Sequence, residues 1–286
     1  MSENESPKEI VVEDALVIAN PWRALRQHTP ARIGLGRAGH SLPTREHLEF
    51  QLAHARARDA VYYEFDSQPL VSELTKQGFE TLQVHSRAEN RLIYLQQPDM
   101  GRRLNQESCE LLQNYKDNNP HPYPQAGFSL RKGEENQAQI AGYNYEAVFV
   151  LADGLSAQAV LRNALPLFNL VSGELLQKSW RVAPVVIANQ SRVALGDEIG
   201  ELLRAEQVAI FIGERPGLSA PDSLGVYLTY NPEVGRLESD RNCISNIRPE
   251  GLSYQEAADT LLYLMREARQ RKTSGVALKD ERDLSP

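Results

Sequence analysis

The chain has 286 residues, of which 41% are hydrophobic and 24% are charged, and its net charge is −7. This length and composition predict a soluble globular protein with one large domain or two modest ones. The negative charge argues against a nucleic-acid-binding protein, because such proteins usually carry a basic stripe. No apolar run approaches the roughly 18 residues that a membrane span needs.

The two cysteines, Cys109 and Cys243, predict a reducing compartment. The acidic and polar start of the chain is unlike the basic and apolar start of a secretory signal, so we expect free thiols in a cytoplasmic protein. Neither cysteine belongs to a C-x-x-C pair, and the six histidines do not show the spacing of metal ligands. We therefore predict no metal site.

Residues 1–115 are predicted to form a smaller, mostly helical N-terminal domain. Thr44 is a candidate cap for a helix whose apolar stripe is Leu48, Leu52 and Ala55. The apolar segment 91–95 predicts a short strand. A turn that begins at Pro98 then opens a helix that runs through Cys109 to residue 115.

Residues 116–145 have a different character, with many proline, asparagine and charged residues and little periodicity. We interpret this segment as a linker or surface excursion and place the domain boundary there.

Residues 146–286 alternate between predicted strands and helices. Continuous apolar runs predict strands that are buried on both faces. Ser156, Gly196 and Ser253 mark the starts of helices, and Ser253 begins a capping-box pattern. The strands recur at a spacing typical of a parallel α/β sheet. They are expected at 147–151, 182–188, 208–212 and 225–230.

Ligands of such sheets bind at the carboxyl ends of the strands, so we expect a crevice at the turns that follow Leu151, Ala188 and Ile212. The turn Gly213–Gly217 stands out, because a Glu-Arg pair follows a purely apolar strand. Loops in this position often carry function, although a solvated turn shaped by proline fits the pattern equally well. The polar stretch 240–246 is predicted to be neither strand nor helix.

Gly34–Gly39 matches the G-x-G-x-x-G pattern of dinucleotide-binding proteins. That pattern has meaning only between a strand and a helix, because the pyrophosphate binds at the helix N-terminus. The preceding residues make a poor strand, and Pro43 follows closely. A glycine-rich loop packed at an interface is the favoured interpretation, and a nicotinamide-dependent oxidoreductase is an alternative.

Five strings in this order resemble the small subunit of ethanolamine ammonia-lyase. The resemblance extends from Asn20 to Gly275, and the strings are Gly36–Gly39, Pro98–Leu104, Asp153–Ser156, Gly213–Leu218 and Asp240–Ile247. It implies a lyase that converts ethanolamine to acetaldehyde and ammonia with adenosylcobalamin. It also implies that residues 146–286 form a Rossmann-like cobalamin-binding domain, and that a large subunit holds the substrate and the catalytic residues.

The cofactor contacts that the resemblance implies fall on Val193, Glu214 and Cys243. The resemblance also implies a base-on cofactor, and the Asp-x-His-x-x-Gly string of base-off proteins is absent from this sequence. The helical part is expected to contact the large subunit in a hetero-oligomer. The segment 116–145 is longer than the connection usual in the family.

Some relatives have a longer leader that is linked to packaging in a protein microcompartment, and packaging is left open for this chain. A non-catalytic interaction module is the remaining alternative function.

Overall fold

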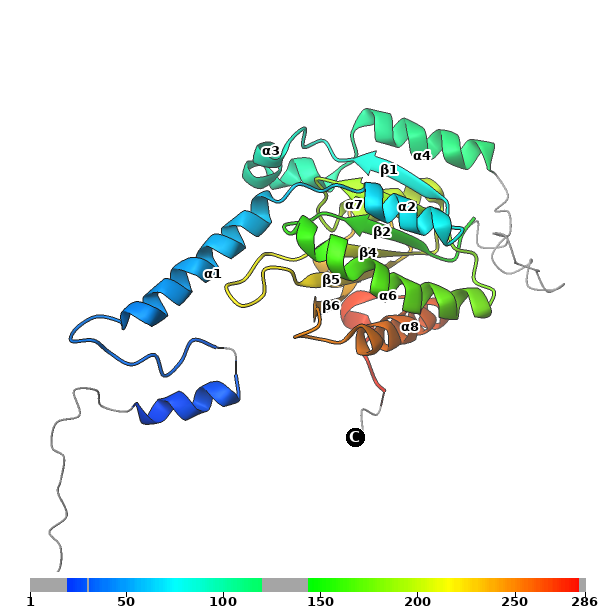
Figure 1. Cartoon of the computed structure of the whole chain (residues 1–286). Coiled ribbons are helices and arrows are strands. Elements are labelled where there is room, and N and C mark those ends of the chain that lie inside the picture. The colour runs from blue at the N-terminus through cyan, green and yellow to red at the C-terminus, as the bar shows by residue number, and fades with distance from the viewer. Residues whose placement is uncertain (1–19, 30, 120–143, 283–286) are drawn as a thin grey trace, which may run out of the picture. The chain divides into compact units, whose positions relative to one another are not determined.

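The computed structural model describes residues 20–29, 31–119 and 144–282 (Figure 1). The chain divides into two compact units, Met1–Ala53 and His54–Pro286. The first unit contains a short 3-10 helix, η1 (Pro21–Gln27), and the beginning of α1 (Thr44–Tyr62). The predicted helix at Thr44 is confirmed, but Leu48 and Leu52 of its apolar stripe are 57% and 52% exposed.

The second unit is built on one six-stranded sheet with the order β1-β3-β2-β4-β5-β6. The first four strands in this order are parallel to one another, whereas β5 and β6 run antiparallel to their neighbours. The α/β class is therefore confirmed. The strands are β1 (Thr81–His85), β2 (Val148–Ala152), β3 (Val185–Asn189), β4 (Gln207–Gly213), β5 (Leu224–Tyr230) and β6 (Arg241–Ile247).

The prediction of an all-parallel sheet is wrong for its last strands, because β5 is antiparallel to β4. Only residues 214–223 connect the two strands, and they contain no helix. A parallel connection needs a crossover of a dozen or more residues, usually a helix, so this short connection returns the chain antiparallel.

Two further predictions for single elements are wrong, and one strand was not predicted. Residues 91–95 form a helix, α3 (Arg91–Gln96), because the Asn90 side chain accepts a hydrogen bond from the backbone N–H of Ile93 and caps it. The stretch predicted to be irregular forms β6, in which a register shift opposite Leu224 and Val226 disturbs the alternation of buried residues. The N-terminal segment also contains β1, which pairs with β3.

The predicted domain boundary at 116–145 differs from the division of the structure after Ala53. Because β1 pairs with β3, residues 81–85 belong to the same sheet as the strands of the C-terminal half. Most of the predicted linker, residues 120–143, lies outside the described residues.

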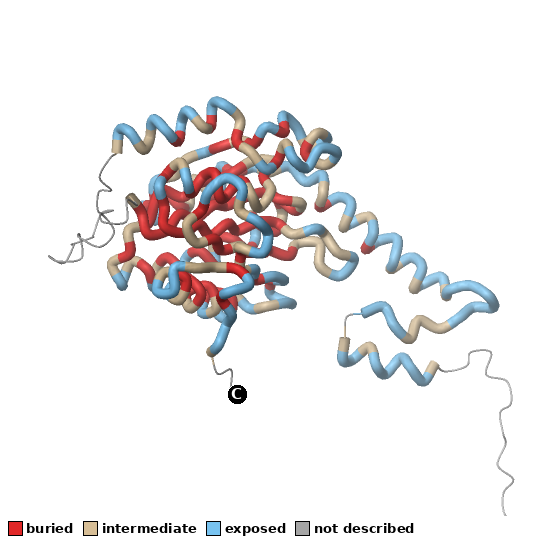
Figure 2. Tube along the Cα trace, turned by 180° about the vertical axis from the view of Figure 1, so that it is seen from behind, coloured by how far each residue is buried: buried red, intermediate tan, exposed pale blue. Residues whose placement is uncertain are grey.

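Helices cover both faces of the sheet (Figure 1). On one face, α2 (Gln68–Lys76), α6 (Ala157–Gln177) and α8 (Tyr254–Arg271) enclose a core in which Phe149 contacts Phe168 and Phe211 edge to face. On the other face, α4 (Gln106–Asn118) and α7 (Leu195–Leu203) pack over a second cluster of aliphatic residues. Figure 2 shows that the buried residues are concentrated in the strands and on the inner faces of these helices.

The predicted helix starts of the second half are confirmed. Ser156 caps α6 by accepting a hydrogen bond from the N–H of Ala159. Ser253 and Glu256 form the predicted capping box at the start of α8. These caps satisfy N–H groups that the first turn of a helix leaves without partners.

Replacing Phe149 tests the importance of the larger core. Phe149→Ala leaves a cavity between Phe168 and Phe211, and we expect it to lower the free energy of unfolding by about 3–5 kcal/mol in urea denaturation. Val276→Ala is the control, because Val276 is 75% exposed and its loss should change stability by less than about 0.5 kcal/mol. Equal stability of the two variants would contradict this description of the core.

Candidate functional site

A cavity of about 410 Å³ lies at the carboxyl ends of β2, β3 and β4, where the sequence predicts a crevice. The strand order reverses here. From β2 the chain passes through α6 to β3, which lies on one side of β2 in the sheet. It then passes through α7 to β4, which lies on the other side of β2. The two helices cover opposite faces of the sheet. Open α/β sheets bind ligands at such a reversal. The cavity is lined from α3, from the turns after the three strands, and from β5.

Two glycines allow the turn after β2 to cross the end of β4 at close range. The N–H of Leu155 donates to the carbonyl of Gly213 at 2.9 Å. Gly154 has a φ of +57°, and a Cβ on it would lie 2.3 Å from the Gly213 oxygen. A Cβ on Gly213 would lie 2.0 Å from the carbonyl oxygen of Ser156. The floor of the cavity therefore requires glycine at both positions.

Asp153 joins the turn after β2 to the turn after β3. Its carboxylate accepts backbone hydrogen bonds from Gly154 at 2.8 Å, Ser191 at 2.9 Å and Gln190 at 3.0 Å. Burial raises the pKa of Asp153 to about 6, although these N–H groups and the Arg91 guanidinium favour the charged form. The sequence pattern predicts only a turn at Asp153, and the signal that points to this residue is its position directly after a buried apolar strand.

Tyr94 of α3 lies between two guanidinium groups at the side of the cavity. The guanidinium carbons of Arg91 and Arg192 are 4.7 and 4.2 Å from the centroid of its ring. Its hydroxyl donates to the carbonyl of Ser191 at 3.0 Å. Burial raises the pKa of Tyr94, so the phenol stays protonated and can act as this donor. Tyr94 was not among the predicted site residues, because the apolar segment 91–95 predicts a strand and not the helix α3.

Glu214, one of the predicted site residues, lines the cavity directly after β4 and bonds to the residue before β5 and to β6. The hydroxyl of Ser223 donates to its carboxylate at 2.5 Å, and the N–H of Asn246 lies 3.3 Å from both carboxylate oxygens. Gly225 leaves room for this side chain, because a Cβ there would lie 2.9 Å from Oε1 of Glu214. Glu214 is therefore held in place and is not a freely moving residue of a surface turn.

The other two predicted residues lie at different distances from the cavity. Val193 lines it and packs against the second core cluster. Cys243 of β6 is not among the lining residues but stands opposite Tyr227 of β5, which does line the cavity. Cys243 is exposed as a residue, yet burial of its thiol raises the pKa of that group, although a hydrogen bond with Tyr227 acts in the opposite direction. The fold thus brings Val193 and Glu214 to one cavity and Cys243 to its border.

The glycine motif Gly34–Gly39 belongs to the first unit and not to this site. Gly34, Gly36 and Gly39 all have positive φ angles, and residues 31–43 form no strand and no helix between η1 and α1. The motif therefore lacks the strand that dinucleotide binding requires.

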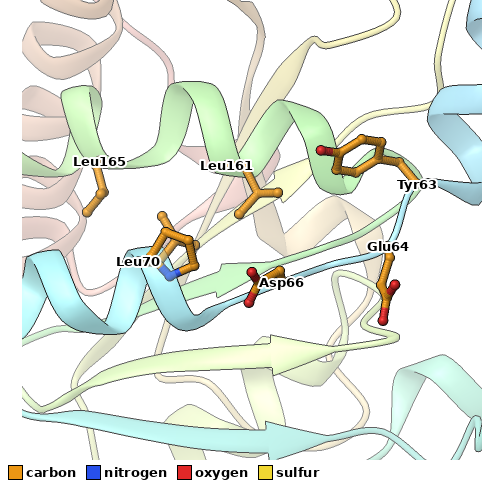
Figure 3. A pocket seen from close by; sticks show the side chains of 7 residues that line it. Tyr63, Glu64, Asp66, Leu70, Leu161 and Leu165 are labelled. Atoms are coloured by element: carbon orange, nitrogen blue, oxygen red, sulfur yellow. The ribbon is translucent and has the colours of Figure 1, made fainter.

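A second cavity, of about 530 Å³, lies between α6 and the segment that precedes α2 (Figure 3). Leu161 and Leu165 of α6 line one side, and Tyr63 and Asp66 lie across from them. None of the predicted site residues lines this cavity. In the described part of the chain, no group of three or more His, Cys, Asp or Glu residues could hold a metal ion. No helix in that part is long and apolar enough to cross a membrane.

Comparison with known proteins identifies the family. The sequence profile of the ethanolamine ammonia-lyase light chain matches residues 19–279. The chain belongs to this family. An ethanolamine ammonia-lyase small subunit of Pseudomonas syringae pv. tomato is 50% identical over 274 residues, which cover 96% of this chain and 88% of that protein.

Small subunits from Pseudomonas fluorescens and Xanthomonas campestris pv. campestris are 52% and 51% identical over 262 residues. Both alignments cover 92% of this chain and 88% of the relative. The resemblance found in the sequence is thereby confirmed.

Gly154 offers a test of the close crossing at the cavity floor. We expect Gly154→Ala to lower the free energy of unfolding of the light chain by at least about 2 kcal/mol, since alanine disfavours the left-handed backbone and its Cβ meets the Gly213 carbonyl. The control is Gly173→Ala in α6, where a Cβ meets nothing within 4 Å. It should stabilise the helix by about 0.5–1 kcal/mol. Urea denaturation that ranks the two variants in the opposite order would contradict the crossing.

Proposed function

We propose that the chain is the small subunit of an ethanolamine ammonia-lyase and binds adenosylcobalamin at the 410 Å³ cavity together with a large subunit. The complex deaminates ethanolamine to acetaldehyde and ammonia. The observation that carries the proposal is the convergence of Val193 and Glu214 on one cavity, with Cys243 at its border. These residues come from three segments that are distant in sequence, and the family resemblance is what suggests adenosylcobalamin as the ligand.

The size of the cavity supports a shared cofactor site. Pockets that enclose a drug-sized ligand have volumes of about 300–1,000 Å³, and this cavity is at the small end of that range. Cobalamin is larger than such ligands, so the cavity can receive only part of it. The remaining surface must be covered by a partner, and the relatives are named as small subunits.

The three residues have different roles in this proposal. The Glu214 carboxylate, held by Ser223 and Asn246, has lone pairs left to accept N–H groups from the amide side chains of the corrin. Val193 supplies an apolar wall. Cys243 offers a protonated thiol, because the raised pKa keeps it from becoming a thiolate ligand.

We propose that the cofactor is bound base-on, with its own dimethylbenzimidazole on cobalt. None of the residues that line the cavity within the described ranges is a histidine, so this cavity offers no imidazole to replace the lower ligand. The bound cofactor supplies the radical chemistry of the deamination. The chain orients the cofactor and excludes water, and the catalytic residues belong to the large subunit.

The parallel strands and their two layers of helices are, in this proposal, a Rossmann-like arrangement, and residues 146–286 supply most of the cofactor site. The N-terminal part contacts the large subunit in a hetero-oligomer. Large apolar side chains on the first unit support this contact, because Trp22, Leu48 and Leu52 are each more than half exposed. A cytoplasmic location, and packaging in a microcompartment, stay predictions.

Glu214 is the sharpest test of the cofactor site. In a complex reconstituted with a large subunit, Glu214→Ala should raise the Kd for cobalamin by roughly tenfold or more, since a hydrogen bond to a charged group contributes about 1.5–3 kcal/mol. Glu214→Gln keeps an acceptor and a similar volume, so its effect should be smaller. The control is Glu233→Ala, at an exposed surface ion pair with Arg236. Wild-type affinity in both Glu214 variants would show that this contact is misplaced.

The dependence on a partner has its own test. The purified chain alone should release no ammonia from ethanolamine in the presence of adenosylcobalamin, because it contributes only one side of the cofactor site. Adding a large subunit should restore turnover and give a red complex that survives gel filtration. Deamination by the isolated chain would contradict the division of roles between the subunits.

A further inference from the structure

The segments that line the cavity lie beyond the ends of the strands, where the sheet ladder no longer fixes their separation. The last pair between β2 and β3 joins Ala152 and Ala188. Gly154 and Val193, which line the cavity, come after these residues. Beyond that pair, one backbone bond from Asp153 N–H to the Ala188 carbonyl at 3.3 Å remains, and side chains supply the other interactions that hold the two turns.

The Asp153 side chain provides such interactions without lining the cavity itself. One carboxylate oxygen accepts the N–H groups of Gly154 and Ser191, and the other accepts the N–H of Gln190. The residue is 1% exposed, so water cannot replace these bonds. An ionised carboxylate only accepts hydrogen bonds, whereas a protonated one presents an O–H donor to the same N–H groups.

Arg91 contacts both the Gly154 turn and the carboxylate of Asp153. Its Nη1 donates to the carbonyl of Gly154 at 2.7 Å and lies 3.6 Å from Oδ2 of Asp153. Its Nε donates to the carbonyl of Val61 at 2.7 Å, and Nη2 is buried without a hydrogen-bond partner. Asp153 is therefore the carboxylate that compensates this buried guanidinium.

We propose that Asp153 is a positioning residue for ligand binding, which acts by holding the Gly154 turn and the Val193 turn in the geometry that the ligand requires. The proposal rests on the proposed function, because the ligand is taken to be cobalamin. Asp153 acts through the backbone of Ser191 and Gln190 and, with Arg91, through Gly154. It makes no contact with the ligand in this account.

The proposal makes affinity depend on pH. Burial raises the pKa of Asp153 to about 6, and the groups that face it are Arg91 and Tyr94 of α3 and the backbone N–H groups of Gly154, Gln190 and Ser191. As the pH falls through about 6, the carboxylate takes up a proton and loses acceptor capacity. Cobalamin affinity should then fall.

As the pH falls, the contribution of Asp153 to stability should increase while the affinity for cobalamin decreases. This difference distinguishes positioning from a simple loss of structure. The folded pKa of Asp153 lies above its ordinary value of 3.8, so the folded chain binds the proton more tightly than the unfolded chain. The contribution of Asp153 to stability is most favourable below pH 3.8 and is lost as the pH rises to about 6. Between pH 7 and 5 the wild type should thus lose affinity without losing stability through this group.

The experiment measures the Kd of cyanocobalamin between pH 5 and 8 for complexes of a large subunit with wild-type or Asp153→Asn chain. We expect the wild-type affinity to fall as the pH drops through about 6. Asp153→Asn should bind roughly tenfold more weakly at pH 7, because an amide cannot accept the same set of N–H groups, and its own pH dependence near 6 should be absent.

Asp197→Asn is the matched control. Asp197 is also a buried aspartate, and it pairs with Arg241 away from the cavity. This variant should keep the wild-type pH profile of affinity even if its stability falls. A changed profile in Asp197→Asn would count against the assignment to Asp153.

Arg91→Gln keeps the proposal testable if Asp153→Asn does not fold. Arg91 lowers the pKa of Asp153, so removing it should move the midpoint of the affinity loss to higher pH. An unchanged midpoint would refute the proposal, as would wild-type affinity and pH profile in folded Asp153→Asn. A wild-type complex that binds no cobalamin at any pH would instead refute the proposed function.

Discussion

The buried carboxylate of Asp153 is the interaction on which the geometry of the cavity depends. It joins the turns that follow two neighbouring parallel strands through three backbone hydrogen bonds, and it compensates the buried Arg91 guanidinium. Desolvation disfavours the charged form of Asp153, whereas the backbone hydrogen bonds favour that form. Because these turns leave the sheet ladder before they reach the cavity, their spacing depends on side chains, and Asp153 is the one among Asp153, Arg91 and Tyr94 whose charge changes near pH 6.

The topology of the sheet explains why Val193 and Glu214 reach one cavity and why Cys243 lies at its border. The reversal of strand order at β2 opens a crevice between the turns that follow β2, β3 and β4. The antiparallel extension through β5 and β6 then brings Tyr227 and Cys243 to its border. Glu214 stands where the parallel and antiparallel parts join, and its bonds to Ser223 and Asn246 fix that junction.

Sequence patterns predicted the elements whose signals are local. Continuous apolar runs identified β2 to β5, and Ser156 and Ser253 marked helices because their caps lie within a few residues of them. The direction of β5 and the existence of β6 depend on pairing between distant segments, and β6 carries a register shift that hides its alternation. Asp153 was missed for the same reason, since its bonds to Gln190 and Ser191 span long distances in sequence. The roles of Val193, Glu214 and Cys243 come from family resemblance, and their contacts with the cofactor stay predictions.

Hydrogen exchange in the complex with a large subunit, compared with and without adenosylcobalamin, tests the account most directly. The cofactor should protect the backbone amides of residues 153–156, 190–194 and 213–216, which form the turns around the cavity. Residues 63–70, beside the second cavity, should be unchanged. Protection of residues 63–70 with no change in the three turns would contradict the assignment of the cofactor to this site.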